Sequence, residues 1–485
     1  MFVGRKDILE DLESLWRKRA PSLVACRGRR RIGKSTLFRE FARRSADAYI
    51  EIEGLPPTEE KEMTNQDEID HFMESVDLAT GCGVRKVTRW LQAFAALDEQ
   101  IDDTKRTVVL LDEISWMGKF DPLFPSVLWK AWETMFRRHD KLIVVICGSV
   151  SSWIQKNILG STGFAGRLSR NYVMTELALS ECVQFWGEAA SRVSPREIFD
   201  VLSITGGVPR YLEEIDPGLS ADENIRRMCF EKGGELFKDF DSIFSPLLGE
   251  DVKPKTDVLA ALVDGPRSGV ELADCLGVDN NGRFAGFLRE LKEGGFIDDD
   301  PGKNPATGAE CRVSKYRLRD NYTRFYLKYV LPRKSEIDRG VFRYASLEQL
   351  PEWDAIRGLQ FENLIVNNCR ALFPFLHIGS AIIESAAPYR NARAARGSKR
   401  KGVQIDLLVQ TACTAYVVEI KRMKHIGSEV EDEMREKIRR LPLRAGMSIR
   451  PVLVYDGELA PVVSGRGYFD AIIPARKLLG FSSEG

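Results

Sequence analysis

Short apolar runs alternate with amphipathic stretches over the first third of the chain. Runs rich in valine, isoleucine and leucine begin at Ser22, Thr107 and Lys141, and each is too short to span a membrane. Buried parallel strands have this pattern. Between the runs, apolar residues recur at helical spacing, as in GKSTLFREF. The pattern predicts an α/β doubly wound domain over residues 1–175.

The pattern changes in character along the rest of the chain. Helical spacing over 176–250, broken by GGVPRYL, predicts a helical lid. Three short helical segments and a hairpin over 251–330 follow the order of a winged helix-turn-helix, a module that serves either as a DNA reader or as a protein-packing domain. A connector, 331–352, precedes an α/β unit at 353–485, where the amphipathic stretch GLQFENLIVNNCRALF is followed by QIDLLVQ, AYVVEIKR and PVLVYDG.

Composition narrows the class of protein. A length of 485 residues with 44% hydrophobic positions suggests about three domains. The formal net charge is zero, so any nucleic-acid contact must come from local basic patches. The charged start and the lack of a long apolar run predict a cytoplasmic protein with no membrane partner. Nine cysteines without C-x-x-C pairs and four histidines give no metal-binding constellation of those residue types.

A glycine-rich segment fits the pattern G-x-x-x-x-G-K-[ST], and it lies after a predicted strand and at the start of a predicted helix. Glycines let backbone N–H groups surround phosphates, and the helix start adds partial positive charge. Lys34 is expected to reach the β- and γ-phosphates of ATP and Ser35 to ligate Mg²⁺. The predicted nucleotide-binding residues of this segment are Gly28, Arg29, Arg30, Arg31, Ile32, Gly33, Lys34, Ser35 and Thr36.

Polar residues follow the next two buried runs. Asp112 is expected to hold the Mg²⁺ shell and Glu113 to polarise the attacking water, the alternative being two helix-capping carboxylates. Ser149 is a candidate sensor of the γ-phosphate or an ordinary strand-ending turn. Arg167 and Arg170, in FAGRLSR, are candidates for an arginine finger or for solvated surface arginines.

Five segments in order, VGRKDILEDLESLW, GRRRIGKSTLFREF, VVLLDEISWM, CGSVSSWI and GGVPRYLEEI, resemble the archaeal-type ATPases of the AAA-related, STAND-like class. The resemblance covers roughly residues 1–330 and implies a P-loop NTPase with a lid and a winged helix. It implies that Pro209, of a G-x-P motif, lies against the nucleotide base. The phosphate loop carries more arginines than is usual in that family.

A second set of chemical groups lies in the last unit. Asp406 and Glu419 fall at one end of a small sheet if their two runs are adjacent strands, and Lys421 then shares the face of Glu419. Two carboxylates can hold Mg²⁺, a lysine can position or deprotonate water, and Glu362 could complete the metal shell. The basic segment 390–401 is either a nucleic-acid contact or a solvated loop.

The order helix Glu, strand Asp, then Glu-x-Lys resembles the PD-(D/E)xK nuclease superfamily, and specifically the nuclease-like domain that follows the archaeal-type ATPase module. This implies a restriction-endonuclease-like α/β domain, either active or degenerate and kept for binding. The expected function is an ATP-dependent switch or motor coupled to a nuclease-like domain acting on nucleic acid, with DNA as the expected partner and a homo-oligomer possible. The rivals are a regulatory ATPase whose last domain only binds DNA, and a scaffold whose ATP state controls protein assembly.

Overall fold

The computed structural model of the chain describes residues 2–56, 63–149, 151–240, 252–311, 315–379, 381–391 and 402–481. The chain divides into two compact units, Met1–Glu176 and Leu177–Gly485. No helix within the described ranges combines the length and the apolar character needed to cross a bilayer.

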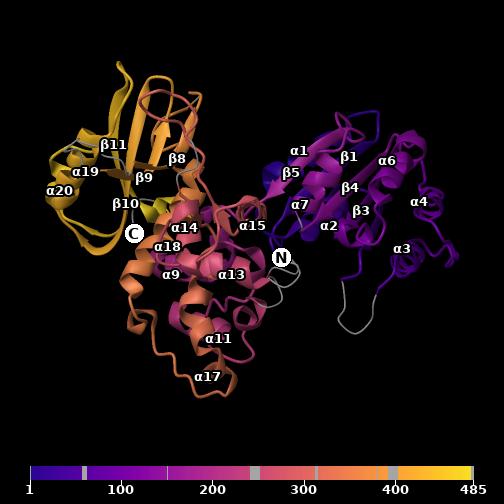
Figure 1. The fold of residues 1–485 in the computed structure, drawn as a ribbon, viewed down its shortest axis with the longest axis horizontal. Helices are drawn as coiled ribbons and strands as arrows, with labels where there is room; N and C mark the ends of the chain where they lie inside the picture. The colour runs from indigo at the N-terminus through magenta and orange to yellow at the C-terminus, as the bar shows by residue number, and fades with distance from the viewer. Residues whose placement is uncertain are drawn as a thin grey trace. The chain divides into compact units, whose positions relative to one another are not determined.

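The first unit is built on a five-stranded sheet in the order β2-β3-β4-β1-β5, and every pairing in it is parallel. The predicted α/β sheet is therefore confirmed (Figure 1). Its strands are β1 (Ser22–Gly28), β2 (Ala48–Glu53), β3 (Thr107–Asp112), β4 (Leu142–Gly148) and β5 (Leu168–Met174). Its helices are α1 (Lys6–Leu15), α2 (Lys34–Ser45), α3 (Asn65–Thr80), α4 (Trp90–Asp98), α5 (Ile114–Met117), α6 (Phe124–Thr134) and α7 (Ser151–Ile154), with a short 3₁₀ helix at Phe136–Arg138 and a π-helical segment at Gln155–Leu159.

Burial separates the middle strands of this sheet from its edges. Every residue of β3 and β4 is buried, as their uninterrupted apolar sequences require. The edge strand β2 alternates between buried and more exposed positions from Ile50 onward, whereas β5 buries only its last residue, Met174. A cluster of aromatic side chains joins α3, α4 and α6 in one core. Its edge-to-face and tilted contacts are made by Phe72, Trp90, Phe94 and Phe124.

Helices make up the first part of the second unit. The segment after the sheet contains α8 (Leu179–Cys182), a 3₁₀ stretch (Val183–Ser191), α9 (Pro195–Thr205), α10 (Pro209–Leu212) and α11 (Ala221–Cys229). The predicted three helices follow as α13 (Val252–Ala261), α14 (Gly269–Leu276) and α15 (Gly282–Glu293), with the antiparallel pair β6 (Ile297–Asp298) and β7 (Arg317–Leu318). Then come α16 (Asn321–Phe325), a π-helical segment (Tyr326–Val330), a 3₁₀ helix (Leu331–Arg333) and α17 (Lys334–Asp338). They are followed by a 3₁₀ helix (Leu347–Gln349), α18 (Trp353–Asn367) and a 3₁₀ helix (Cys369–Leu372).

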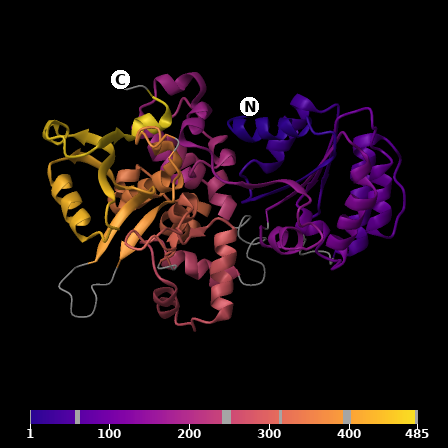
Figure 2. The same cartoon turned by 90° about the horizontal axis from the view of Figure 1, so that it is seen from above.

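The chain ends in a second five-stranded sheet, in the order β12-β11-β10-β9-β8. The pairs β8–β9 and β9–β10 are antiparallel, whereas β10–β11 and β11–β12 are parallel. The orange and yellow strands of this sheet are seen from a second direction in Figure 2. Its elements are β8 (Ser385–Asn391), β9 (Val403–Gln410), β10 (Thr414–Ile426), α19 (Glu429–Arg440), β11 (Ser448–Leu459), α20 (Pro461–Gly465), β12 (Ala471–Pro474) and a closing turn at Ala475–Leu479.

A buried arginine joins this sheet to α9. The Arg422 side chain, on β10, is 3% exposed and pairs with Asp200 at 2.7 Å and Asp456 at 2.8 Å. It also donates to Ser203 Oγ at 3.0 Å and to the carbonyl of Arg196 at 3.2 Å. A guanidinium with this many partners satisfies two carboxylates and part of a helix surface at once.

We expect Arg422→Ala to destabilise the second unit by about 3–5 kcal/mol, because it leaves two partly buried carboxylates without their counter-ion. Hydrogen exchange should report the loss as faster exchange in α9 and β10. Lys424→Ala, at an exposed position of the same strand, is the matched control and should leave exchange unchanged. Equal protection in the Arg422 variant would show that the ion pairs contribute little.

Candidate nucleotide and carboxylate sites

The glycine-rich segment forms a loop between β1 and α2, as its pattern predicts. Gly28 has a φ of 156°, and a Cβ there would lie 2.5 Å from the Met174 carbonyl oxygen on β5. Gly33 precedes α2 in the left-handed conformation, with φ 85°. Lys34 Nζ donates to the carbonyls of Gly28 at 3.0 Å and Arg29 at 3.1 Å, so its ammonium is held inside the loop.

The variable positions of the loop differ in burial, with Arg30 and Arg31 partly exposed. Arg29 and Ile32 are buried, at 5% and 1% exposure. The Arg30 guanidinium lies 5.1 Å from the ring centre of Trp116, which follows β3. Arg31 adopts a φ of 68°, the left-handed region that non-glycine residues rarely occupy. Thr36, the last residue predicted in this set, lies in the first turn of α2.

The carboxyl ends of β1, β3 and β4 bring the predicted polar residues together. The Ser35 hydroxyl donates to Asp112 Oδ2 across the strand ends. Ser149 donates to Glu113 Oε2 through both its backbone N–H, at 3.1 Å, and its hydroxyl, at 2.8 Å. Glu113 has φ 46° and ψ 45°, a conformation that costs about 1–2 kcal/mol for an L-residue. The residue in this unfavourable backbone conformation is the one whose carboxylate accepts both hydrogen bonds from Ser149.

Three further residues, Arg167, Arg170 and Pro209, were predicted for nucleotide chemistry. Arg167 pairs with Glu133 at 2.5 Å, and Arg170 makes two 2.7 Å contacts to Asp11. Both arginines thus have carboxylate partners within the first unit, and a finger role for either stays a prediction. Pro209 is the first residue of α10 in the second unit, and its role against a nucleotide base likewise stays a prediction.

Comparison with known proteins agrees with this geometry. Residues 2–215 match the family described as "ATPase domain predominantly from Archaea", so the chain contains an archaeal-type ATPase domain. The Walker-type ATPase paby2304 of Pyrococcus abyssi superposes with a TM-score of 0.50 at 15% identity, over 67% of this chain and 96% of that one. The likeness extends to the fold, a P-loop NTPase-like α/β domain with a parallel sheet.

Two proteins of Methanocaldococcus jannaschii are similar in sequence. The uncharacterized protein MJECL04 is 22% identical over 392 residues, which cover 78% of this chain and 81% of that protein. The uncharacterized ATP-binding protein MJ0423 is 46% identical over 41 residues, 8% of this chain and 70% of that protein. The longer match extends well beyond the ATPase domain, since it covers more of the chain than residues 2–215 do.

The second predicted set converges on the C-terminal sheet. The strands β9 and β10 are antiparallel neighbours, as the sequence analysis assumed, with Leu407 opposite Val418. Asp406 and Glu419 come next on the two strands, and Asp406 Oδ2 accepts a 2.9 Å hydrogen bond from the Ile420 N–H. The Glu419 side chain is 2% exposed, and the Asp406 side chain 11%. Two buried carboxylates therefore lie side by side at this position.

Two lysines face these carboxylates, and the sequence pattern predicted only Lys421. Lys421 Nζ lies 3.1 Å from Glu419 Oε1 and 2.8 Å from Glu433 Oε2. Lys437, on α19, lies 2.5 Å from Glu419 Oε2 and 3.8 Å from Asp406 Oδ1. The sequence does contain a pattern that predicts the position of Lys437. This residue follows the buried Val430 and Met434 at helical spacing, so it lies on the same inward face of α19.

Burial dominates the electrostatics of this site. It raises the pKa of Asp406 to about 7, with further contributions from the charges of Glu419 and Glu362 and an opposing one from Lys437. Burial also raises the pKa of Glu362 above its ordinary value, against the nearby Arg390. In the described part of the chain, no three or more carboxylates, histidines or cysteines group closely enough to hold a metal ion. Glu362 is therefore not grouped with Asp406 and Glu419 as a third direct ligand.

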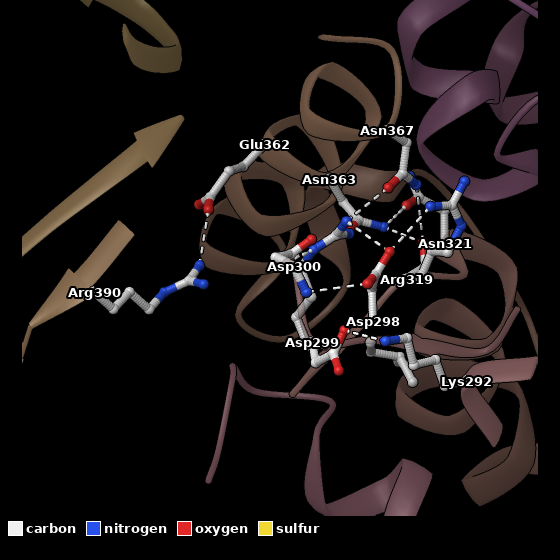
Figure 3. Close-up of polar contacts among 12 residues, drawn as sticks. Lys292, Asp298, Asp299, Asp300, Arg319, Asn321, Glu362, Asn363, Asn367 and Arg390 are labelled. Atoms are coloured by element: carbon white, nitrogen blue, oxygen red, sulfur yellow. Dashed lines mark hydrogen bonds and ion pairs between the residues drawn. The ribbon is translucent and has the colours of Figure 1, made fainter. Parts of the chain in front are cut away.

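Glu362 instead lies beside a polar network on α18. Its carboxylate is 3.3 Å from Arg390 on β8 (Figure 3). On the same helix, Asn363 and Asn367 accept hydrogen bonds from Arg317, which also pairs with Asp300 at 2.6 Å. The β6–β7 hairpin is thus tied to the helix that carries Glu362. Of the basic segment 390–401, residues 392–401 lie outside the described residues.

We expect Ser149→Ala to lower ATP turnover by about tenfold and leave ATP affinity unchanged, because it removes one hydrogen bond, worth about 1.5 kcal/mol, from the Glu113 carboxylate. Steady-state ATPase assays and nucleotide titrations would measure the two effects. Ser115→Ala is the matched control, since its buried hydroxyl has no hydrogen-bond partner among the described residues. Unchanged turnover in Ser149→Ala would mean that this contact does not position the carboxylate.

Proposed function

We propose that this chain is an ATP-hydrolysing switch or motor, coupled through a winged-helix module to a metal-dependent nuclease-like domain that acts on nucleic acid, with DNA as the expected substrate. The observation that carries the second half is the pairing of Asp406 with Glu419 on adjacent strands, beside Lys421. The first half rests on the archaeal-type ATPase domain and its phosphate loop.

In the ATPase domain, the proposed roles follow from the contacts. Lys34 and the α2 N-terminus bind the nucleotide phosphates. Ser35 and Asp112, already in contact with each other, would hold Mg²⁺, which supplies charge stabilisation when bound. Glu113 orients the attacking water and accepts its proton, while Ser149 holds the Glu113 carboxylate in place.

The winged-helix proposal rests on α13, α14, α15 and the β6–β7 pair, in that order. The segment after β6 reaches the edge of the C-terminal sheet. There the Lys303 N–H donates to Ser385 Oγ at 3.1 Å, and its carbonyl accepts from Gln410 Nε2 at 2.8 Å. These contacts support a module that holds the nuclease-like domain in a defined position.

In the last domain, the donor set fits a divalent cation, because Asp406 and Glu419 are both carboxylates and both buried. These two residues would hold the ion, whose bound form supplies Lewis acidity toward a phosphodiester. Lys421 would position the water: burial acts to lower its pKa, but its contacts with Glu433 and Glu419 outweigh burial and raise the pKa, so the group stays an ammonium. Glu362, held by Arg390, would act from outside the direct ligand set.

A second candidate is a regulatory ATPase whose last domain binds DNA or a protein partner without cleaving. The contact of Lys437 with both carboxylates favours it, because an ammonium already balances their charge. Purified protein tested on plasmid and single-stranded DNA, with and without ATP and Mg²⁺ or Mn²⁺, separates the two. Metal-dependent cleavage selects the first, and salt-sensitive binding without cleavage selects the second.

For the ATPase site, we expect Lys34→Ala to abolish ATP binding or hydrolysis, and Glu113→Gln to bind ATP but lose turnover. The first change removes the charge that meets the phosphates, and the second removes only the base. Nucleotide titration and phosphate release measure both effects. Lys141→Ala, at an exposed position next to β4, is the control. Full hydrolysis in either test variant would remove the assignment of that residue.

For the carboxylate site, we expect Asp406→Ala to abolish cleavage and weaken metal binding, whereas Lys421→Ala should reduce cleavage by about 100-fold or more and leave the metal largely bound. ATPase activity should survive both changes unless cleavage gates turnover. Lys424→Ala and Asp432→Ala, at exposed positions nearby, are matched controls. Cleavage that persists in Asp406→Ala would place the chemistry elsewhere.

A further inference from the structure

Lys437 stands out because it contacts both buried carboxylates from a different element. Its ammonium lies 2.5 Å from Glu419 Oε2 and 3.8 Å from Asp406 Oδ1. The residue lies on α19, a helix that packs against β9 and β10, the strands that carry the two acids. A lysine bridging two carboxylates stands in the same relation to them as a bound cation would.

The remaining carboxylate oxygens also have donors. Asp406 Oδ2 accepts from the Ile420 N–H at 2.9 Å, and Glu419 Oε1 lies 3.1 Å from Lys421 Nζ. Two ammonium groups therefore face the two carboxylates, and one of them, Lys421, is shared with Glu433. A divalent cation binds carboxylate oxygens at about 2.0–2.6 Å, so it would compete for the oxygens that Lys437 contacts.

From these contacts we infer that Lys437 is a resident counter-ion of the Asp406–Glu419 pair, which a divalent cation must displace in order to bind. The inference rests on the proposed metal site. Adding two positive charges beside both ammonium groups would leave the site with excess positive charge in a poorly solvated position. Moving one ammonium away lowers this excess by one charge.

The Lys437 side chain is able to make this movement. Its side chain is 24% exposed, so its ammonium has a route to solvent, whereas Glu419 is 2% exposed and has none. A lysine carries its charge on a flexible four-carbon stem, so the ammonium can leave without movement of the α19 backbone. Lys421 differs, because Glu433 holds its ammonium as well, at 2.8 Å. Lys437 is accordingly the ammonium that a metal ion displaces.

Calorimetric titration of the full chain with Mn²⁺, in nucleotide-free buffer, tests this inference. We expect Lys437→Gln to bind Mn²⁺ about tenfold more tightly than the unchanged chain, within the range typical of coupling between two ligands. Lys437→Arg, which retains the charge, should not tighten binding. Arg439→Gln, on the exposed side of α19, is the matched control, and Asp406→Ala identifies the heat that belongs to this site.

The sign of the change distinguishes competition from simple support of the site. If Lys437 only held the carboxylates in place, its removal would leave metal binding unchanged or weaker, and either result overturns the inference. A Lys437→Gln protein that unfolds in chelator should refold with Mn²⁺, and failure to do so also overturns it. If neither protein binds Mn²⁺, this inference and the proposed metal site both fall. Tighter binding without any nucleic-acid cleavage would leave the inference standing and remove only the nuclease activity.

Discussion

Buried carboxylates occur at both candidate sites of this chain, and each needs a donor from the protein because water does not reach it freely. Moving an ionised carboxylate out of water is costly unless hydrogen bonds or counter-ions replace its hydration. Asp112 accepts a hydrogen bond from the Ser35 hydroxyl, Glu113 accepts one from Ser149, and Glu419 forms ion pairs with two lysines. These pairings fix the partners that each carboxylate has in the structure.

The same requirement organises the second unit away from the sites. Arg422 meets Asp200 and Asp456 from within a strand of the sheet, and Arg317 meets Asp300 together with two asparagines of α18. Each guanidinium offers five donors in a rigid plane, so it can satisfy groups on several elements at once. The outcome is a unit in which helices and sheet are joined by polar contacts as well as by apolar packing.

Arg422 has a particular position in this arrangement, because it directly follows Lys421 on β10. Its partner α9 belongs to the region that matches the archaeal-type ATPase family, although it lies in the second structural unit. The strand that carries Glu419 and Lys421 is therefore in direct contact with a helix of the ATPase family region. A physical connection of this kind offers a route for coupling between the ATPase domain and the proposed activity of the last domain.

The sequence by itself determined the features that depend on neighbours along the chain. The spacing of glycines, lysine and serine predicts the phosphate loop. The uninterrupted apolar runs of β3 and β4 predict strands that are buried on both faces. The half-exposed edge strands β2 and β5 lack such runs and were not predicted. Only the tertiary structure decided that Ser149 binds Glu113, that Glu362 faces Arg390 and that Lys437 reaches both carboxylates. Those contacts join residues distant in sequence, and their formation depends on how helices and strands pack, which local spacing does not encode.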